Sequence, residues 1–218
     1  MIKWIKLINN VDIRTTLLLF LNKLRLSLAE VVVYKALRSL DKGLPLTHIL
    51  AEILMYSYLI GKGFEYVSIE ETVGLTKCDI YARQGALDVC IEVETAVVPL
   101  DFILEGQNYI VAKHIKKVIQ ISKSNISFAS FAYPYGVIPL IPIELLKKPE
   151  ERSREELEKL FNIARKFFNL DKEDLTYLRN VVLGDTYLYD ITSLKVVPLQ
   201  KSNLQHLISL YANMFSQE

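Results

Sequence analysis

Three carboxylates in the stretch CDIYARQGALDVCIEVET, residues 78–95, have the types and spacing that could bind a metal ion. Asp79 stands in its first half, and Glu92 and Glu94 stand in its second half. Like charges on one face of a sheet repel, and clustered carboxylates raise one another's pKa unless a cation neutralises them. Mg²⁺ or Mn²⁺ is the natural cation, because hard ions take oxygen ligands from carboxylates and water.

The same stretch predicts a β-hairpin with a two-residue turn at Gly85 and Ala86, because glycine suits the first position of a type II′ turn. In this register Asp79 faces Glu92, and strand alternation places both side chains on one face of the sheet. No lysine or arginine lies beside them in the sequence. The hairpin therefore indicates a cation site, although the solvated face of a half-exposed hairpin is an alternative.

A fourth acid lies in an expected helix. Glu52 is the only Asp, Glu, Lys or Arg between Lys42 and Lys62, within the apolar segment HILAEILMYSYLI. A buried glutamate without a partner is costly, so a helix packed on the sheet would bring this side chain to the hairpin acids. A partly exposed position at the helix edge is the alternative. The histidines have no metal-like spacing and are interpreted as ordinary surface or half-buried residues: His48, His114 and His206.

The order of these acids resembles that of the PD-(D/E)XK nuclease superfamily: a helix glutamate, an aspartate at the start of a hairpin, and an ExK motif thirteen residues on. The spacing is most similar to that of archaeal Holliday-junction resolvases and related nucleases encoded by archaea and their viruses. The matching positions are Glu52, Asp79 and Glu92, and the resemblance covers about residues 46–133. Glu94 replaces the usual lysine and gives EVE, a change that some restriction endonucleases of the superfamily share.

The resemblance implies metal-dependent hydrolysis of DNA phosphodiester bonds, with Glu52, Asp79 and Glu92 as ligands of Mg²⁺ or Mn²⁺. It also implies catalytic roles for Asp79, Glu92 and Glu94. Lys113, on the next helix, is the hypothetical source of the missing amine, while Glu94 could instead be a further metal ligand or the base. The alternative is a catalytically inactive DNA-binding or assembly protein that kept the fold and lost the lysine.

A basic helix is expected after the hairpin, at about residues 103–123, in a stretch that has no acid between Glu105 and Glu144. Its lysines recur at helical spacing beside an apolar stripe, which predicts a ridge that follows the phosphates of duplex or branched DNA. A solvated surface is the plainer interpretation, and the net charge of +1 argues against nucleic-acid binding through bulk charge. The lysines assigned to DNA are Lys113, Lys116, Lys117 and Lys123.

The order of helices and strands predicts an α/β fold, with a restriction-endonuclease-like mixed sheet flanked by helices. We expect residues 1–42 to form a helical arm, residues 43–148 the nuclease-like core, and residues 149–218 a C-terminal helix–hairpin–helix extension packed on the core. The arm has more apolar surface than one helix on a small core needs, which predicts a homodimer. A helical interaction module with an incidental acidic hairpin is a third interpretation.

Composition indicates a folded chain, since 51% of the 218 residues are hydrophobic and 23% are charged. The longest apolar run is interrupted by Lys23, Arg25 and Glu30, so we expect no membrane span. The N-terminus lacks a signal-peptide pattern, which predicts a cytoplasmic protein. Cys78 and Cys90 fall on opposite faces of the predicted hairpin, so a disulfide between them is not expected.

Overall fold

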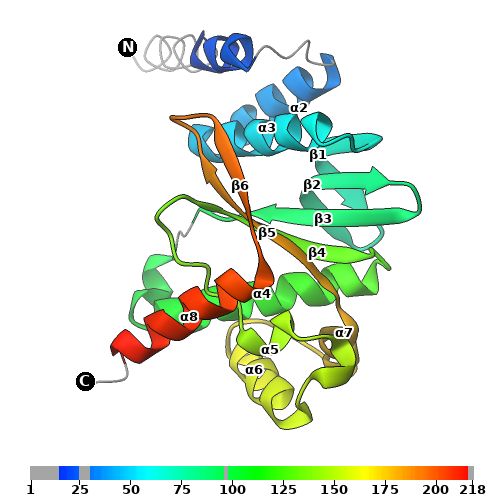
Figure 1. Cartoon of the computed structure of the whole chain (residues 1–218), viewed down its shortest axis with the longest axis vertical. Coiled ribbons are helices and arrows are strands. Elements are labelled where there is room, and N and C mark those ends of the chain that lie inside the picture. Colours follow the sequence, from blue (N-terminus) through cyan, green and yellow to red (C-terminus); the bar gives the residue numbers. More distant parts are fainter. Residues whose placement is uncertain (1–14, 25–29, 96–97, 216–218) are drawn as a thin grey trace.

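A six-stranded mixed sheet forms the centre of the molecule (Figure 1). The structure is a computed structural model that describes residues 15–24, 30–95 and 98–215. The strands lie in sequence order across the sheet: β1 (Tyr66–Val73), β2 (Thr76–Gln84), β3 (Leu87–Val93), β4 (Phe128–Pro134), β5 (Leu183–Asp190) and β6 (Lys195–Leu199). β3, β4 and β5 are parallel, and the other neighbours are antiparallel. The predicted α/β class is therefore confirmed.

Helices cover both faces of the sheet. One face carries α2 (Glu30–Asp41) and α3 (Leu46–Gly61), and the helix at residues 15–23 lies beyond them and joins the same hydrophobic cluster (Figure 1). The other face carries α4 (Gly106–Lys123), which packs against α6 (Arg154–Phe167) and α7 (Asp174–Asn180). The remaining helical elements are η1 (Leu100–Glu105), α5 (Ile143–Leu146), η2 (Pro149–Glu151) and α8 (Lys201–Phe215).

The burial of β3 follows from its central place between β2 and β4, with helices on both faces. Its C-terminal five residues are all buried, and they include Glu92. Glu94, the next acid along the chain, is buried as well. A carboxylate that is taken out of water needs a cation or hydrogen-bond donors, so the fold itself requires partners for these two side chains.

The predicted hairpin register is confirmed from the turn as far as Ile80, which pairs with Ile91. Gly85 has a φ of 59°, as the first position of its tight turn requires. The expected pair of Asp79 with Glu92 does not continue the ladder in the part of the chain that the structure describes. Strand β2 diverges from β3 at this point.

This divergence overturns the prediction that the two cysteines remain apart. Cys78 and Cys90 form a disulfide, with their Cα atoms 5.4 Å apart. Regular alternation would place Cys78 on the same side as Ile80, which packs against α3. Instead Cys78 lies with Cys90 on the α4 side. The alternation breaks at Asp79, because β2 leaves the ladder there.

The predicted N-terminal arm falls partly on residues 1–14 and 25–29, which lie outside the described residues. Within residues 15–23, Leu18 and Leu19 are exposed, and the homodimer stays a prediction. Strands β5 and β6, from the C-terminal third, extend the same sheet as the hairpin, and the domain boundaries also stay predictions. None of the described helices is long and apolar enough to cross a membrane.

Candidate metal centre and its lysine partners

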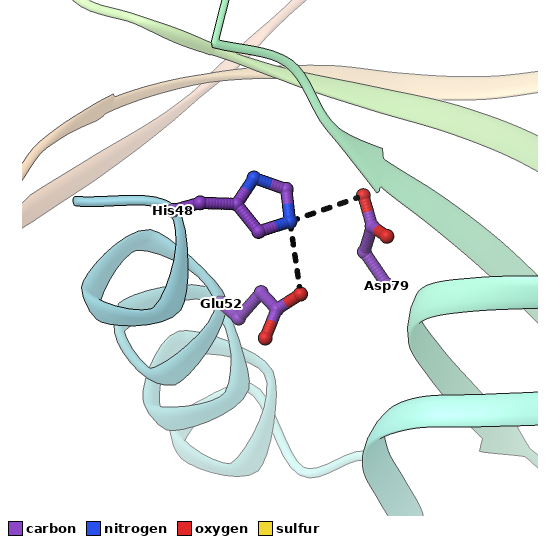
Figure 2. Close-up of side chains that lie close together, drawn as sticks. All are labelled: His48, Glu52 and Asp79. Atoms are coloured by element: carbon purple, nitrogen blue, oxygen red, sulfur yellow. Dashed lines mark ion pairs between the residues drawn. The ribbon is translucent and has the colours of Figure 1, made fainter. Parts of the chain in front are cut away.

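Two side chains from successive turns of α3 meet an aspartate from β2 (Figure 2). Nε2 of His48 lies 3.0 Å from Oε1 of Glu52 and 3.9 Å from Oδ2 of Asp79. One ligand atom from each of the three residues lies within 4.8 Å of the other two. This His48–Glu52–Asp79 triad is a cluster that could hold a metal ion.

Glu52 is the most deeply buried member of the triad, with an exposed fraction of 0%. Neither of its carboxylate oxygens has a hydrogen bond of good geometry from the described residues, although His48 approaches Oε1. Burial raises the pKa of Glu52 to about 7, and the negative charges of Asp79 and Glu70 add to the effect. The contact with His48 opposes it. A buried acid with these surroundings favours either a proton or a bound cation.

Asp79 owes its position to the point where β2 leaves β3. Its Oδ2 accepts a hydrogen bond of 2.8 Å from the backbone N–H of Val93, in place of a ladder bond. Burial raises the pKa of Asp79, while the charges of His48 and Lys117 lower it. His48 comes from α3 on one face of the sheet and Lys117 comes from α4 on the other. Asp79 therefore interacts electrostatically with groups from both faces.

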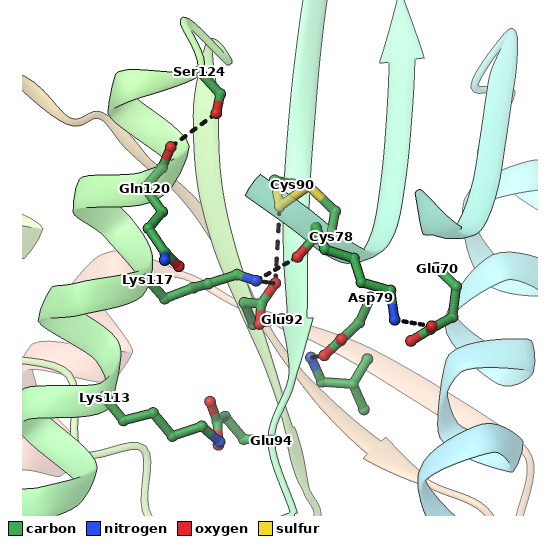
Figure 3. Close-up of polar contacts among 12 residues, drawn as sticks. Glu70, Cys78, Asp79, Cys90, Glu92, Glu94, Lys113, Lys117, Gln120 and Ser124 are labelled. Carbon is green, nitrogen blue, oxygen red and sulfur yellow. Dashed lines mark hydrogen bonds and ion pairs between the residues drawn. A yellow bond between two sulfur atoms is a disulfide. The ribbon is translucent and has the colours of Figure 1, made fainter. Parts of the chain in front are cut away.

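Glu92 projects from β3 toward α4, where Lys117 meets it (Figure 3). Nζ of Lys117 lies 2.8 Å from Oε1 of Glu92 and also donates to the backbone carbonyl of Lys77. Burial raises the pKa of Glu92 to about 8, with the charges of Asp79 and Glu94 adding to it and Lys117 opposing it. Glu52, Asp79 and Glu92 are called the acid cluster below, since the charge of Asp79 raises the pKa of both glutamates.

Glu94 has a different environment from the acid cluster. Its Oε2 lies 2.7 Å from Nζ of Lys113, and its Oε1 lies 3.5 Å from Nε2 of His114 (Figure 3 draws the lysine contact). Burial alone would raise the pKa of Glu94, but His114 and Lys113 outweigh it and lower the pKa to about 2. His114 is itself held by the hydroxyl of Tyr133, 3.1 Å from Nε2, and by the carbonyl of Leu140, 3.2 Å from Nδ1. Glu94 is therefore an ionised, paired carboxylate.

The four lysines that were assigned to DNA all have partners within the chain. Lys113 and Lys117 turn inward to Glu94 and Glu92, as described above. Lys116 lies over the ring of Phe168, with Nζ 4.6 Å from its centroid, and Lys123 pairs with Asp174. Helix α4 thus directs its lysine charges to internal partners.

Sequence reasoning gave no metal role to His48, which the structure places against Glu52 and Asp79. The available signal was the spacing of His48 and Glu52, four residues apart, which puts two side chains on one face of a helix. Lys117 was assigned to the DNA ridge, whereas the structure brings it to Glu92. One helical turn separates it from Lys113, so spacing alone does not say which amine reaches which acid.

Among known proteins, this chain has a weak structural likeness to a solved structure. No family model matches the chain, and no curated protein matches it. The solved structure of SfsA from Pyrococcus furiosus in complex with Ca²⁺ is similar at 15% identity and a TM-score of 0.28. The match covers 70% of this chain and 59% of SfsA, so the chain spans less than two thirds of that protein. A likeness of this size carries no argument about function.

Proposed function

We propose that this chain is a metal-dependent nuclease that hydrolyses phosphodiester bonds of DNA. The observation that carries the proposal is the His48–Glu52–Asp79 triad, in which a fully buried glutamate has His48 as its one close polar neighbour among the described residues and an aspartate beside that histidine. The order of Glu52, Asp79 and Glu92 along the chain, which resembles that of PD-(D/E)XK nucleases, supports it. The charge of Asp79 raises the pKa of Glu92, and this interaction supports assigning Glu92 to the same site.

The donor set fits a divalent cation. Glu52 and Asp79 offer carboxylate oxygens and His48 offers an imidazole nitrogen. Carboxylates suit both Mg²⁺ and Mn²⁺, while the nitrogen favours Mn²⁺, because the softer transition metal accepts imidazole more readily. When bound, such an ion polarises a phosphate oxygen and lowers the pKa of water.

Within this proposal Lys117 has the role that the ExK lysine has in the family. Its ammonium lies beside Glu92, and its side chain is only 18% exposed. An ammonium at that position can donate hydrogen bonds to a phosphate oxygen or an attacking water and stabilise negative charge in the transition state. Lys113 and Glu94, by contrast, are held by each other. We therefore assign the catalytic amine to Lys117 and a positioning role at the end of β3 to the Lys113–Glu94 pair.

Cleavage of labelled DNA tests the proposal. Duplex, single-stranded and four-way-junction substrates are incubated with Mn²⁺, with Mg²⁺ and with a chelator. We expect metal-dependent cleavage by the wild type, and a loss of at least about 100-fold in Glu92→Gln, which keeps the side-chain shape but removes the charge. Glu150→Gln, which changes an exposed acid of η2 just before α6, is the matched control and should cleave normally. Absence of cleavage on every substrate would refute the proposal.

A non-catalytic DNA-binding protein is the second candidate, and one observation favours it. Lys117 already contacts Glu92 at 2.8 Å without any metal, so this acid has a partner in a purely structural role. This candidate predicts DNA binding without cleavage and equal binding by Glu92→Gln.

The homodimer expected from the N-terminal arm is tested separately by sedimentation of the full chain.

A further inference from the structure

A second polar pocket lies beside the acid cluster, between α2, β1 and β2, and has a volume of about 230 Å³. Side chains from all three elements line it, and the cations outnumber the acid. We call it the basic pocket and define it by Lys35, Arg38, Lys42, Glu70, Thr72 and Lys77. Its volume is below the roughly 300 Å³ at which pockets for drug-sized ligands begin, which suits a small anion.

Two of its four cations are already neutralised. Nζ of Lys35 lies 2.8 Å from Oε2 of Glu71 and donates to Oγ of Ser68 at 2.6 Å. Lys77 pairs with Glu70.

The other two cations of the basic pocket, Arg38 and Lys42, can bind a ligand. Arg38 and Lys42 are both exposed. Within residues 15–24, 30–95 and 98–215, neither side chain makes an ion pair or a side-chain hydrogen bond. Arg38 lies in the last turn of α2, where a cation stabilises the helix dipole. That effect does not explain why Lys77, from β2, lines the same pocket.

The basic pocket adjoins the acid cluster through the strands. The ladder between β1 and β2 pairs the residues on either side of Glu70 with those on either side of Asp79, so these two acids stand opposite each other. Glu70 has a φ of 50°, in the left-handed region that few residues other than glycine adopt. The backbone carbonyl of Lys77 accepts a hydrogen bond from Lys117, the lysine that contacts Glu92. One wall of the basic pocket is therefore built from residues that border the acid cluster: Glu70 lies opposite Asp79, and Lys77 contacts the lysine that pairs with Glu92.

We propose that the basic pocket binds a phosphate of the DNA backbone beside the phosphodiester that the acid cluster holds. This inference rests on the proposed function. Arginine and lysine are the usual donors to phosphate, and Arg38 can bind two phosphate oxygens at once. The lysines of α4 are engaged with internal partners, so Arg38 and Lys42 are the free cations next to the site in the described part of the chain. They hold the strand in register while the acids act on the neighbouring phosphate.

The test compares Arg38→Ala/Lys42→Ala with Arg179→Ala/Lys172→Ala, which removes the same charge from exposed positions on the α7 side of the sheet. Binding of labelled duplex DNA is measured in chelator over a range of salt concentrations. We expect the first variant to bind about ten-fold more weakly at low salt, with the slope of log K against log salt smaller by about one, the value for one lost phosphate contact. The control variant should match the wild type. Arg38→Lys/Lys42→Arg, which keeps both charges, should retain most of the affinity.

Two results would overturn the basic pocket as a DNA subsite. One is wild-type DNA affinity and slope in Arg38→Ala/Lys42→Ala, with inorganic phosphate binding also unchanged. The other is wild-type DNA affinity in the same variant together with a loss of inorganic phosphate binding, measured by calorimetry, which would assign the pocket to a free anion. Cleavage by the same preparations separates this inference from the proposed function. A wild type that cleaves DNA, beside a double variant with unchanged DNA affinity, rejects the subsite alone, whereas a wild type that binds DNA through Arg38 and Lys42 but never cleaves it rejects the nuclease alone.

Discussion

The ammonium of Lys117 lies 2.8 Å from the carboxylate of Glu92, so the amine nearest this acid comes from helix α4 and not from the strand that carries the glutamate. In the ExK motif that the hairpin resembles, the lysine stands two residues after the glutamate. Here that position is Glu94, which binds Lys113 instead. Lys113 and Lys117 of α4 thus contact two different acids.

Replacing Lys117 with methionine tests whether its amine takes part in cleavage. Methionine keeps most of the side-chain volume, and removal of one positioned donor is expected to lower the cleavage rate by about 10²–10³-fold. Lys116→Met is the matched control, because the neighbouring lysine lies over Phe168 and away from the acids. It should cleave within about two-fold of the wild type, because Lys116 is half-buried against Phe168 and its loss leaves the acids with their partners. Equal rates in both variants would leave Lys117 as a structural partner of Glu92.

Restoring the family lysine with Glu94→Lys is expected to damage the protein. The new cation would lie beside Lys113 and His114 in a buried site. We expect a loss of about 2–4 kcal/mol in the free energy of unfolding, somewhat less than for a fully buried pair, because the side chain of Lys113 is 43% exposed. Urea denaturation measures this loss. The exchange Glu94→Lys/Lys113→Glu should recover part of the stability, and unchanged stability in the single variant would contradict the pairing.

The pKa values of Glu52 and Glu92 predict how the stability of the metal-free protein depends on pH. Burial raises them to about 7 and about 8, from ordinary values of 4.5. The folded state therefore keeps protons that the unfolded chain releases near pH 4.5, so this stability is full below that pH and is lost as the pH rises to about 8. Glu94 acts in the opposite sense, but its pKa of about 2 places its effect below this range.

Thermal denaturation in chelator should therefore show the Tm falling by several degrees between about pH 5 and about pH 8. A bound cation needs ionised carboxylates, so Mn²⁺ should raise the Tm more at the higher pH. In Glu52→Gln/Glu92→Gln both the pH dependence and the Mn²⁺ effect should shrink. A metal-free Tm that rises over this range would contradict the assigned protonation.

Reduction of the Cys78–Cys90 disulfide should destabilise the hairpin where the acid cluster is built. The bond closes a loop with a sequence separation of 12, which corresponds to about 3 kcal/mol of loop-closure entropy. For a chain of this size we expect the Tm to fall by about 6–12 °C after reduction. Cys78→Ser/Cys90→Ser should show the lower Tm with or without reductant. Free thiols detected in the denatured, unreduced protein would contradict the bond.

The local features of this protein were open to sequence reasoning because they depend on neighbours along the chain. Alternation and a glycine turn gave the hairpin register from the turn to Ile80, and apolar periodicity gave the helices on both faces of the sheet. The resemblance in spacing singled out Glu52 and Asp79, whose carboxylates the structure brings together. The register and the helices needed only the regular geometry of a strand or a helix, and the two acids needed only the order of residues along the chain.

The remaining features depend on how separate elements meet, and only the tertiary structure decided them. β2 leaves β3 at Asp79, which breaks the alternation and brings Cys78 to Cys90. The packing of α3 on the sheet adds His48 to the acids. The rotation of α4 about its axis sends Lys117 to Glu92. A strand irregularity and the rotation of a packed helix arise from contacts between distant segments, so no local pattern in the sequence specifies them.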